Sequence, residues 1–216
     1  MRVFIAGDHS DIAKSLSFML GIDGHEVTGW HRGEPLTLSA WHLAIFALGK
    51  VAPVGKWQFP SDWRSNFESN VLAPVSILQE IWDSRLANAS VCFMAGSNPQ
   101  KIMPGYAPYN ASKMALLKVC EQLDFETPDV KFFALGPGYV DTKIHNATKE
   151  ASWPNERIAK GGSTPIEKIY NCLKWCISQP KEVVGGRNIC VSDPYGPELA
   201  ERLKANPSLF KLRRVE

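Results

Sequence analysis

Tyr109-Asn110-Ala111-Ser112-Lys113 lies in a segment, residues 107–123, whose pattern predicts a helix. Residues four apart lie on one face of a helix about one turn apart, so the Tyr109 phenol and the Lys113 ammonium should emerge side by side. A positive charge about 5 Å away, at an effective dielectric constant of about 20, favours the phenolate by roughly 3 kcal/mol. The pair therefore predicts a tyrosine of lowered pKa that can give a proton to a carbonyl oxygen. The alternative is an ordinary exposed pair on a helix surface.

Apolar runs on both sides of this helix indicate strands. Residues 89–95 precede it and lead into a loop with Ser97. Residues 130–135 follow it and lead into Gly136-Pro137-Gly138-Tyr139-Val140-Asp141-Thr142. Strand and helix alternate in this way through the chain, which is typical of a parallel sheet with helices on both faces.

A further strand, loop and helix open the chain. Residues 2–6 are apolar, Gly7 begins a polar loop, and apolar side chains then recur at helical spacing. The N–H groups of such a loop and the positive end of the helix suit a pyrophosphate. A dinucleotide-binding loop normally has three glycines, whereas Asp11 and Ala13 stand here at the two later positions. The loop alone leaves nucleotide binding open.

The next expected strand, residues 25–30, ends in Trp30-His31-Arg32-Gly33. In a βαβ nucleotide site an acidic residue at this tip suits a free ribose 2′-OH, and an arginine suits a 2′-phosphate. Arg32 therefore predicts a phosphorylated dinucleotide, unless it is only a surface arginine in a turn.

The chain is short at this point. Ten residues separate Arg32 from the next apolar run, residues 43–49, whereas a helix–strand–helix detour needs about 30. We therefore expect the outer third strand of the sheet to be reduced or missing.

Several other segments carry a local signal. Ser61 is expected to cap a long helix, residues 61–82, in which Pro74 should cause a bend and Asn70 is either functional or merely exposed. Residues 143–163 lack an apolar period, as a mobile substrate lid would. Thr164-Pro165-Ile166-Glu167 predicts a capping box at the start of a helix. A last strand at 188–191 and a short helix from Pro197 follow.

Composition predicts a soluble, globular protein. The chain has 216 residues, of which 44% are hydrophobic, and this suffices for a sizeable core. A net charge of +2 gives no reason to expect nucleic acid, and neither a signal peptide nor a membrane span is predicted. Five cysteines, mostly in apolar contexts, predict a reduced, cytoplasmic protein. Cys172 and Cys176 share a helix face, but no second Cys or His pair completes a metal site, so we expect no metal.

The order of the unusual residues resembles the short-chain dehydrogenase/reductase family, of which this chain would be a shortened member. The most specific part is Tyr109 to Lys113 followed by Pro137-Gly138 and Thr142. The resemblance covers residues 1–192. It implies a Rossmann-like, doubly wound parallel sheet in a single domain, with the C-terminal helix and tail at 193–216.

The resemblance also implies a role for individual residues. Tyr109 would be the general acid or base, and Lys113 would lower its pKa and hold the nicotinamide ribose. Ser97 would hydrogen-bond the substrate carbonyl, and Asn70 would help to hold a proton-relaying water. The cofactor would be NADP(H), bound by Gly7, Ser10, Asp11, Ile12, Arg32, Gly49, Lys113, Pro137, Gly138, Val140 and Thr142.

The sequence departs from the family pattern only where the cofactor binds. Besides the missing glycines, Phe46-Ala47-Leu48-Gly49 replaces Asn-Asn-Ala-Gly, and Gly136 replaces an asparagine. Because the catalytic set is intact, we expect an NADP(H)-dependent oxidoreductase that interconverts a small carbonyl and an alcohol. The alternative is a non-catalytic, nucleotide-binding regulator or interaction module. The family further implies a homodimer or homotetramer built on the helices at 62–82 and 107–123.

Overall fold

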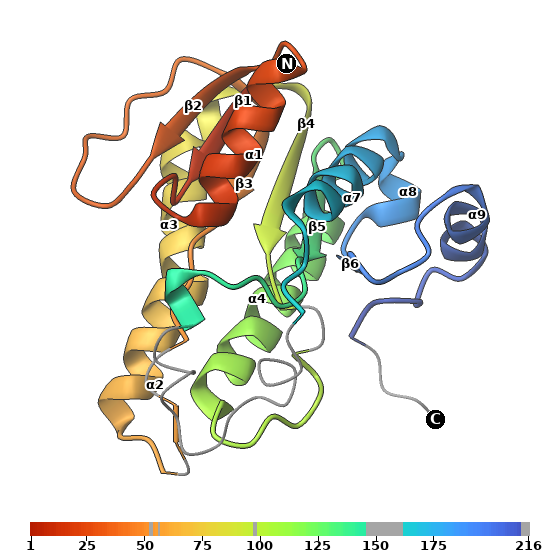
Figure 1. Cartoon of the computed structure of the whole chain (residues 1–216). Coiled ribbons are helices and arrows are strands. Elements are labelled where there is room, and N and C mark those ends of the chain that lie inside the picture. Colours follow the sequence, from red (N-terminus) through yellow and green to blue (C-terminus); the bar gives the residue numbers. More distant parts are fainter. Residues whose placement is uncertain (52–53, 56, 97–98, 146–161, 213–216) are drawn as a thin grey trace.

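The computed structural model describes residues 1–51, 54–55, 57–96, 99–145 and 162–212. These residues form a six-stranded sheet, with all strands parallel, in the order β2-β1-β3-β4-β5-β6 (Figure 1). The strands are β1 Arg2–Ala6, β2 Glu26–Trp30, β3 Trp41–Phe46, β4 Arg85–Met94, β5 Lys131–Gly136 and β6 Asn188–Cys190. The predicted α/β fold, a doubly wound Rossmann-like sheet in a single domain, is confirmed.

Helices cover both faces of the sheet (Figure 1). One face is covered by α1 Asp11–Ile22, α7 Ile166–Ser178, α8 Lys181–Val184 and α9 Pro197–Ala205. The other is covered by α3 Ala73–Ile81 and α4 Ala107–Glu126. The remaining elements are α2 Pro60–Phe67, the π-helical turn η1 Glu68–Leu72, and the 3₁₀ turns η2 Trp82–Ser84 and η3 Lys143–His145.

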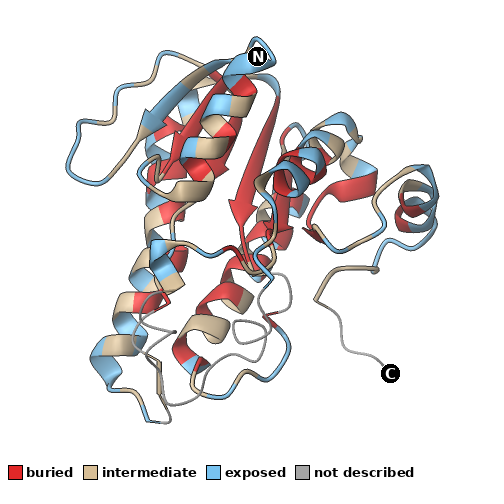
Figure 2. Ribbon diagram, viewed as in Figure 1, coloured by how far each residue is buried: buried red, intermediate tan, exposed pale blue. Residues whose placement is uncertain are grey.

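The inner strands β1, β3 and β5 are apolar almost throughout because both of their faces are buried, whereas the edge strand β2 has no buried residue. In β1, Val3 and Ile5 pack in the core beneath α1 and α7, whereas Phe4 and Ala6 pack in the core beneath α3 and α4. Alternate residues of the strand thus point to opposite faces of the sheet, and both faces are buried. Figure 2 shows the buried inner strands between helices whose outer faces are exposed, with the edge strand β2 largely exposed.

The expected loss of the outer strand is confirmed. β2 lies at the edge of the sheet, and residues 31–40, all of which are described, contain no strand. The chain passes from β2 to β3, on the other side of β1, through a connection too short for the usual detour.

Two expected helix caps are wrong. Helix α2 begins at Pro60, and the Asp62 carboxylate accepts a hydrogen bond of 2.9 Å from the Phe59 N–H, so Ser61 lies inside the first turn. Helix α7 begins at Ile166, with no side-chain capping bond among the described residues. Thr164 instead ties two loops together, since its N–H donates to the Tyr139 carbonyl at 2.6 Å.

The long helix expected at 61–82 is divided into α2, η1 and α3. Pro74 has no N–H to pair with the Asn70 carbonyl four residues earlier, and the π-helical turn lies at this point.

Other expectations concern the ends of the chain. The boundary expected at residue 192 stays a prediction, and beyond it Leu199 and Leu203 of α9 are buried in the core beneath α7. Most of the expected lid at 143–163 lies outside the described residues. Within the part of the chain that is described, none of the helices is long and apolar enough to cross a membrane.

Candidate active site

A cavity of about 210 Å³ lies at the carboxyl ends of the central strands. Ligands of open α/β sheets bind at this edge, where the strand order reverses, and here the reversal falls between β1 and β3. The loops after β1, β3, β4 and β5 and two side chains of α4 form its walls. The lining residues are His9, Ser10, Asp11, Ile12, Ala47, Leu48, Gly49, Met94, Ala95, Gly96, Tyr109, Lys113, Pro137, Gly138, Val140, Thr142, Lys143, Ile144 and His145.

Most of the predicted site residues meet in this cavity. Gly7, Arg32 and Asn70 are described but do not line it, and Ser97 lies outside the described residues. The lining residues that sequence reasoning missed lie beside predicted ones in the same loops, where only the fold shows which side chains turn inward. The predicted residues that line the cavity are Ser10, Asp11, Ile12, Gly49, Tyr109, Lys113, Pro137, Gly138, Val140 and Thr142.

Lys113 is a buried ammonium in the cavity wall. Only 4% of the residue is exposed, and Nζ donates to the Met94 carbonyl at 2.9 Å. Burial lowers the pKa of Lys113 to about 8, because a charge is poorly solvated there. Two further N–H groups of the ammonium remain for a ligand or for Tyr109.

The expected lowering of the Tyr109 pKa is wrong. Burial, and then the neighbouring Tyr106, raise the pKa of Tyr109 to about 12. The phenolate would lose more solvation than the Lys113 charge returns to it, since that ammonium is directed at the Met94 carbonyl. The phenol therefore keeps its proton at neutral pH and can act as a proton donor.

Asn70 is fully buried and joins three segments, so it is not the merely exposed asparagine of the alternative interpretation. Its Oδ1 accepts from the Lys50 N–H at 2.7 Å, and its Nδ2 donates to the Lys50 carbonyl at 2.9 Å and to Ser112 Oγ at 2.8 Å. The Ser112 hydroxyl donates in turn to the Tyr109 carbonyl at 2.7 Å. Asn70 thus positions both the loop after β3 and the first turn of α4.

We expect Asn70→Ala to lower the free energy of unfolding by about 2 kcal/mol, because it removes three hydrogen bonds, two to the half-buried backbone of Lys50 and one to the buried Ser112 hydroxyl. Ser112→Ala, which removes only part of this network, should cost less. Urea unfolding of the two variants and the parent measures the difference. If Asn70→Ala costs no more stability than Ser112→Ala, Asn70 does not hold the two segments together.

Two glycines keep the backbone close to the cavity. A Cβ on Gly49 would lie 3.7 Å from Lys113 Nζ and 3.6 Å from Asn70 Oδ1. A Cβ on Gly96 would lie 3.8 Å from the Tyr109 hydroxyl oxygen. The loops after β3 and β4 therefore leave room for a ligand beside the two titratable groups.

The opposite end of the cavity is the start of α1. Ser10 is its N-cap and accepts from the Ala13 N–H at 3.2 Å, and the first-turn N–H groups are available to an anion. Gly7 has φ +89°, and a Cβ there would come within 3.0 Å of the Ala47 carbonyl oxygen. The Asp11 carboxylate lies 3.4 Å from the Lys143 N–H, which donates to it. The N–H groups at the start of α1 suit an anionic group at this end of the cavity.

The profile of a known family, described as "short chain dehydrogenase", matches residues 48–153. The matched segment includes Gly49, Asn70, Tyr109, Lys113 and the loop after β5. Over these residues, just under half of the chain, the sequence is similar to the short-chain dehydrogenase/reductase family.

Comparison with known proteins shows how far the likeness extends. An uncharacterized oxidoreductase of Schizosaccharomyces pombe is 27% identical over 123 residues, which are 56% of this chain and 49% of the relative. The match thus spans about half the length of this curated relative.

Solved structures share the fold. A short-chain type dehydrogenase/reductase from Mycobacterium ulcerans has a TM-score of 0.74 at 15% identity, over 88% of this chain and 87% of that one. A small-chain dehydrogenase in complex with NADPH has a TM-score of 0.74 at 17% identity, over 88% and 95%. At these identities the likeness shows the family's fold alone.

Proposed function

We propose that the protein is an NADP(H)-dependent oxidoreductase that interconverts a carbonyl and an alcohol by hydride transfer, with Tyr109 as general acid and base. The observation that carries this proposal is the meeting of Tyr109 and Lys113 in one cavity with the start of α1, Gly49 and the loop after β5. A proton donor, a fixed cation and an anion-binding helix end are the groups that such a reaction needs.

Each group has a part in the proposed reaction. When bound, NADPH would supply the hydride. Backbone N–H groups at Ser10 to Ile12 would bind its phosphates. Lys113 would bind the nicotinamide ribose through the ammonium N–H groups that do not donate to the Met94 carbonyl. Pro137, Gly138, Val140 and Thr142 would contact its reactive end. Tyr109 would give its proton to the carbonyl oxygen, and Ser97 is proposed as a second donor to that oxygen.

At neutral pH the proposed general acid is in its protonated form. With its pKa raised to about 12, the Tyr109 phenol is protonated and ready to donate, whereas the phenolate needed to accept a proton from an alcohol is scarce. The substrate would be a small carbonyl compound.

The choice of NADP(H) rests on Arg32. It is exposed, directly follows His31 after the end of β2, and forms no ion pair with any described residue. A guanidinium can meet a 2′-phosphate with paired, charge-assisted hydrogen bonds. Two carboxylates count against this choice, because their negative charge would repel a 2′-phosphate. Asp8 and Glu34 both contact His31, the residue before Arg32, at 3.1 and 3.3 Å.

We expect NADPH to bind at least about tenfold more tightly than NADH, a difference of about 1.4 kcal/mol. Arg32→Ala should remove the preference, while Arg64→Ala, a change of an exposed arginine on α2, should keep it. Fluorescence titration with both dinucleotides measures the ratio. Equal affinities in the parent, or a preference that survives Arg32→Ala, would show that Arg32 is only a surface charge.

The proposed function is tested by a turnover screen. The full chain is incubated with NADPH or NADH and a panel of ketones, aldehydes and quinones, and oxidation of the dinucleotide is followed. Oxidation that depends on a carbonyl supports the proposal. Dinucleotide binding without turnover on any member favours the non-catalytic alternative, and absence of binding contradicts both.

We further propose a cytoplasmic homodimer or homotetramer. All five cysteines are free and buried, as a reducing compartment allows. Leu72, in the segment 62–82 expected to meet a second copy, and Phe125, two residues beyond the expected segment 107–123, are exposed apolar side chains.

A further inference from the structure

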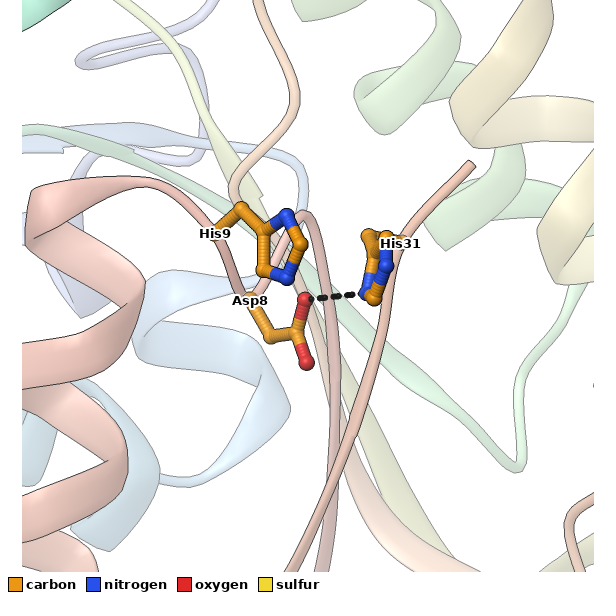
Figure 3. Close-up of side chains that lie close together, drawn as sticks. All are labelled: Asp8, His9 and His31. Carbon is orange, nitrogen blue, oxygen red and sulfur yellow. Dashed lines mark hydrogen bonds and ion pairs between the residues drawn. The ribbon is translucent and has the colours of Figure 1, made fainter. Parts of the chain in front are cut away.

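Asp8, His9 and His31 gather at the carboxyl ends of β1 and β2 (Figure 3). Asp8 and His9 belong to the loop after β1, and His31 directly follows Trp30, which pairs with Ala6. His31 Nδ1 lies 3.1 Å from Asp8 Oδ1, and the His9 and His31 rings stack with centroids 3.5 Å apart. One ligand atom from each of the three residues lies within 4.8 Å of the others.

The strand beneath makes room for this cluster. A Cβ on Gly29, in β2, would lie 2.6 Å from Asp8 Oδ2 and 2.8 Å from the Asp8 Cβ. Only glycine therefore lets the Asp8 side chain lie across β2 and reach His31. The Gly7 and Asp8 N–H groups both donate to the Trp30 carbonyl, at 2.7 and 3.2 Å, which fixes the loop against the strand.

A second carboxylate approaches the same nitrogen. Glu34 Oε2 lies 3.3 Å from His31 Nδ1. The Trp30 indole N–H donates to the Glu34 carbonyl at 3.0 Å, so the turn that carries Glu34 is held near the end of β2. Two carboxylate oxygens thus converge on one imidazole nitrogen.

We propose that Asp8, His9, His31 and Glu34 bind one divalent transition-metal ion of the Zn²⁺ class. Zn²⁺ is bound by histidine nitrogen and carboxylate oxygen at about 2.0 to 2.2 Å, and two such ligands of a tetrahedral ion lie about 3.3 Å apart. The separations of 3.1 and 3.3 Å between His31 Nδ1 and the two carboxylates match this spacing. His9 is exposed, so its ring can turn to supply the fourth ligand.

The ligand set selects the class of ion. Two imidazoles with two carboxylates suit Zn²⁺ and its neighbours in the first transition row, whereas Ca²⁺ and Mg²⁺ prefer oxygen ligands. The site adjoins the cavity, because His9 also lines it, but contains neither Tyr109 nor Lys113. Metal binding can therefore be measured without turnover, on the chain free of dinucleotide.

Calorimetric titration of the full chain, without a histidine tag, with ZnCl₂ tests the proposal. We expect one ion per chain. His31→Ala and Asp8→Asn should each weaken binding at least about tenfold, because loss of a residue that only hydrogen-bonds a metal ligand already costs about that much. Circular dichroism checks that the variants are folded. Visible absorption bands of tetrahedral Co²⁺ in the parent, lost in His31→Ala, provide a second readout.

His25→Ala is the matched control. The N-terminal amine of Met1 lies 3.3 Å from His25 Nδ1, which makes these two groups another pair that could chelate a metal. The five cysteines are buried and do not compete in the folded chain. Loss of binding in His25→Ala with retention in His31→Ala would overturn the proposal, as would no binding below about 100 μM.

Discussion

Tyr109→Phe is expected to lower kcat at least about a hundredfold while fold and dinucleotide affinity stay as in the parent. The substitution removes only the hydroxyl that would protonate the carbonyl oxygen, and a positioned general acid contributes about 10² to 10⁴ in rate. The aromatic ring, which packs edge-on to Tyr106 with centroids 6.5 Å apart, remains. Steady-state kinetics on a substrate found by the screen, with dinucleotide titration beside it, measure both quantities.

Tyr106→Phe is the matched control for this prediction. It also deletes a phenol hydroxyl, but from Tyr106, a buried tyrosine three residues earlier that does not line the cavity. Its kcat should stay close to that of the parent. Turnover by Tyr109→Phe within about tenfold of the parent would rule out the assigned role of the phenol.

Lys113→Met should abolish turnover and yet stabilise the folded chain by about 3 kcal/mol at pH 7. Burial lowers the pKa of Lys113 from 10.5 to about 8, so between these values the unfolded chain binds more protons than the folded one. Stability therefore rises with pH across this window, and below pH 8 the protein carries the whole cost of a buried charge. At about 1.36 kcal/mol for each pKa unit, that cost is about 3 kcal/mol.

The hydrogen bond from Lys113 to the Met94 carbonyl offsets part of this gain, because methionine cannot donate. Urea unfolding of parent and variant at pH 7, and again above pH 10.5, measures the difference. The variant should be the more stable at pH 7, and the two should converge at high pH. A variant that is less stable at pH 7, or a gap that pH does not change, would contradict a buried ammonium at this position.

Sequence reasoning succeeded where the argument depended on spacing along the chain. The alternation of strand and helix predicted the layers, and the ten residues after Arg32 predicted the missing strand, because chain length limits what a connection can span. Tyr109 and Lys113 share a cavity because residues four apart share a helix face.

Sequence reasoning failed where the outcome depends on what other segments do. Burial reverses the expected direction of the Tyr109 pKa, and burial follows from tertiary packing. Asn70 uses its side chain to hold Lys50, a contact twenty residues away that no local pattern reveals. The Asp8 and His31 cluster has no local sequence signal, because parallel pairing of β1 and β2 joins residues that are distant in sequence.

Transfer of deuterium from labelled NADPH tests the central claim most directly. NADPH with deuterium in either of the two positions at nicotinamide C4 is incubated with the full chain and a carbonyl substrate from the screen, and the alcohol is analysed by mass spectrometry. If the hydride passes to the carbonyl carbon while Tyr109 protonates the oxygen, one of the two labelled forms gives an alcohol with one deuterium on the carbinol carbon. An alcohol without deuterium from either form, or NADPH consumed without alcohol, would contradict the account.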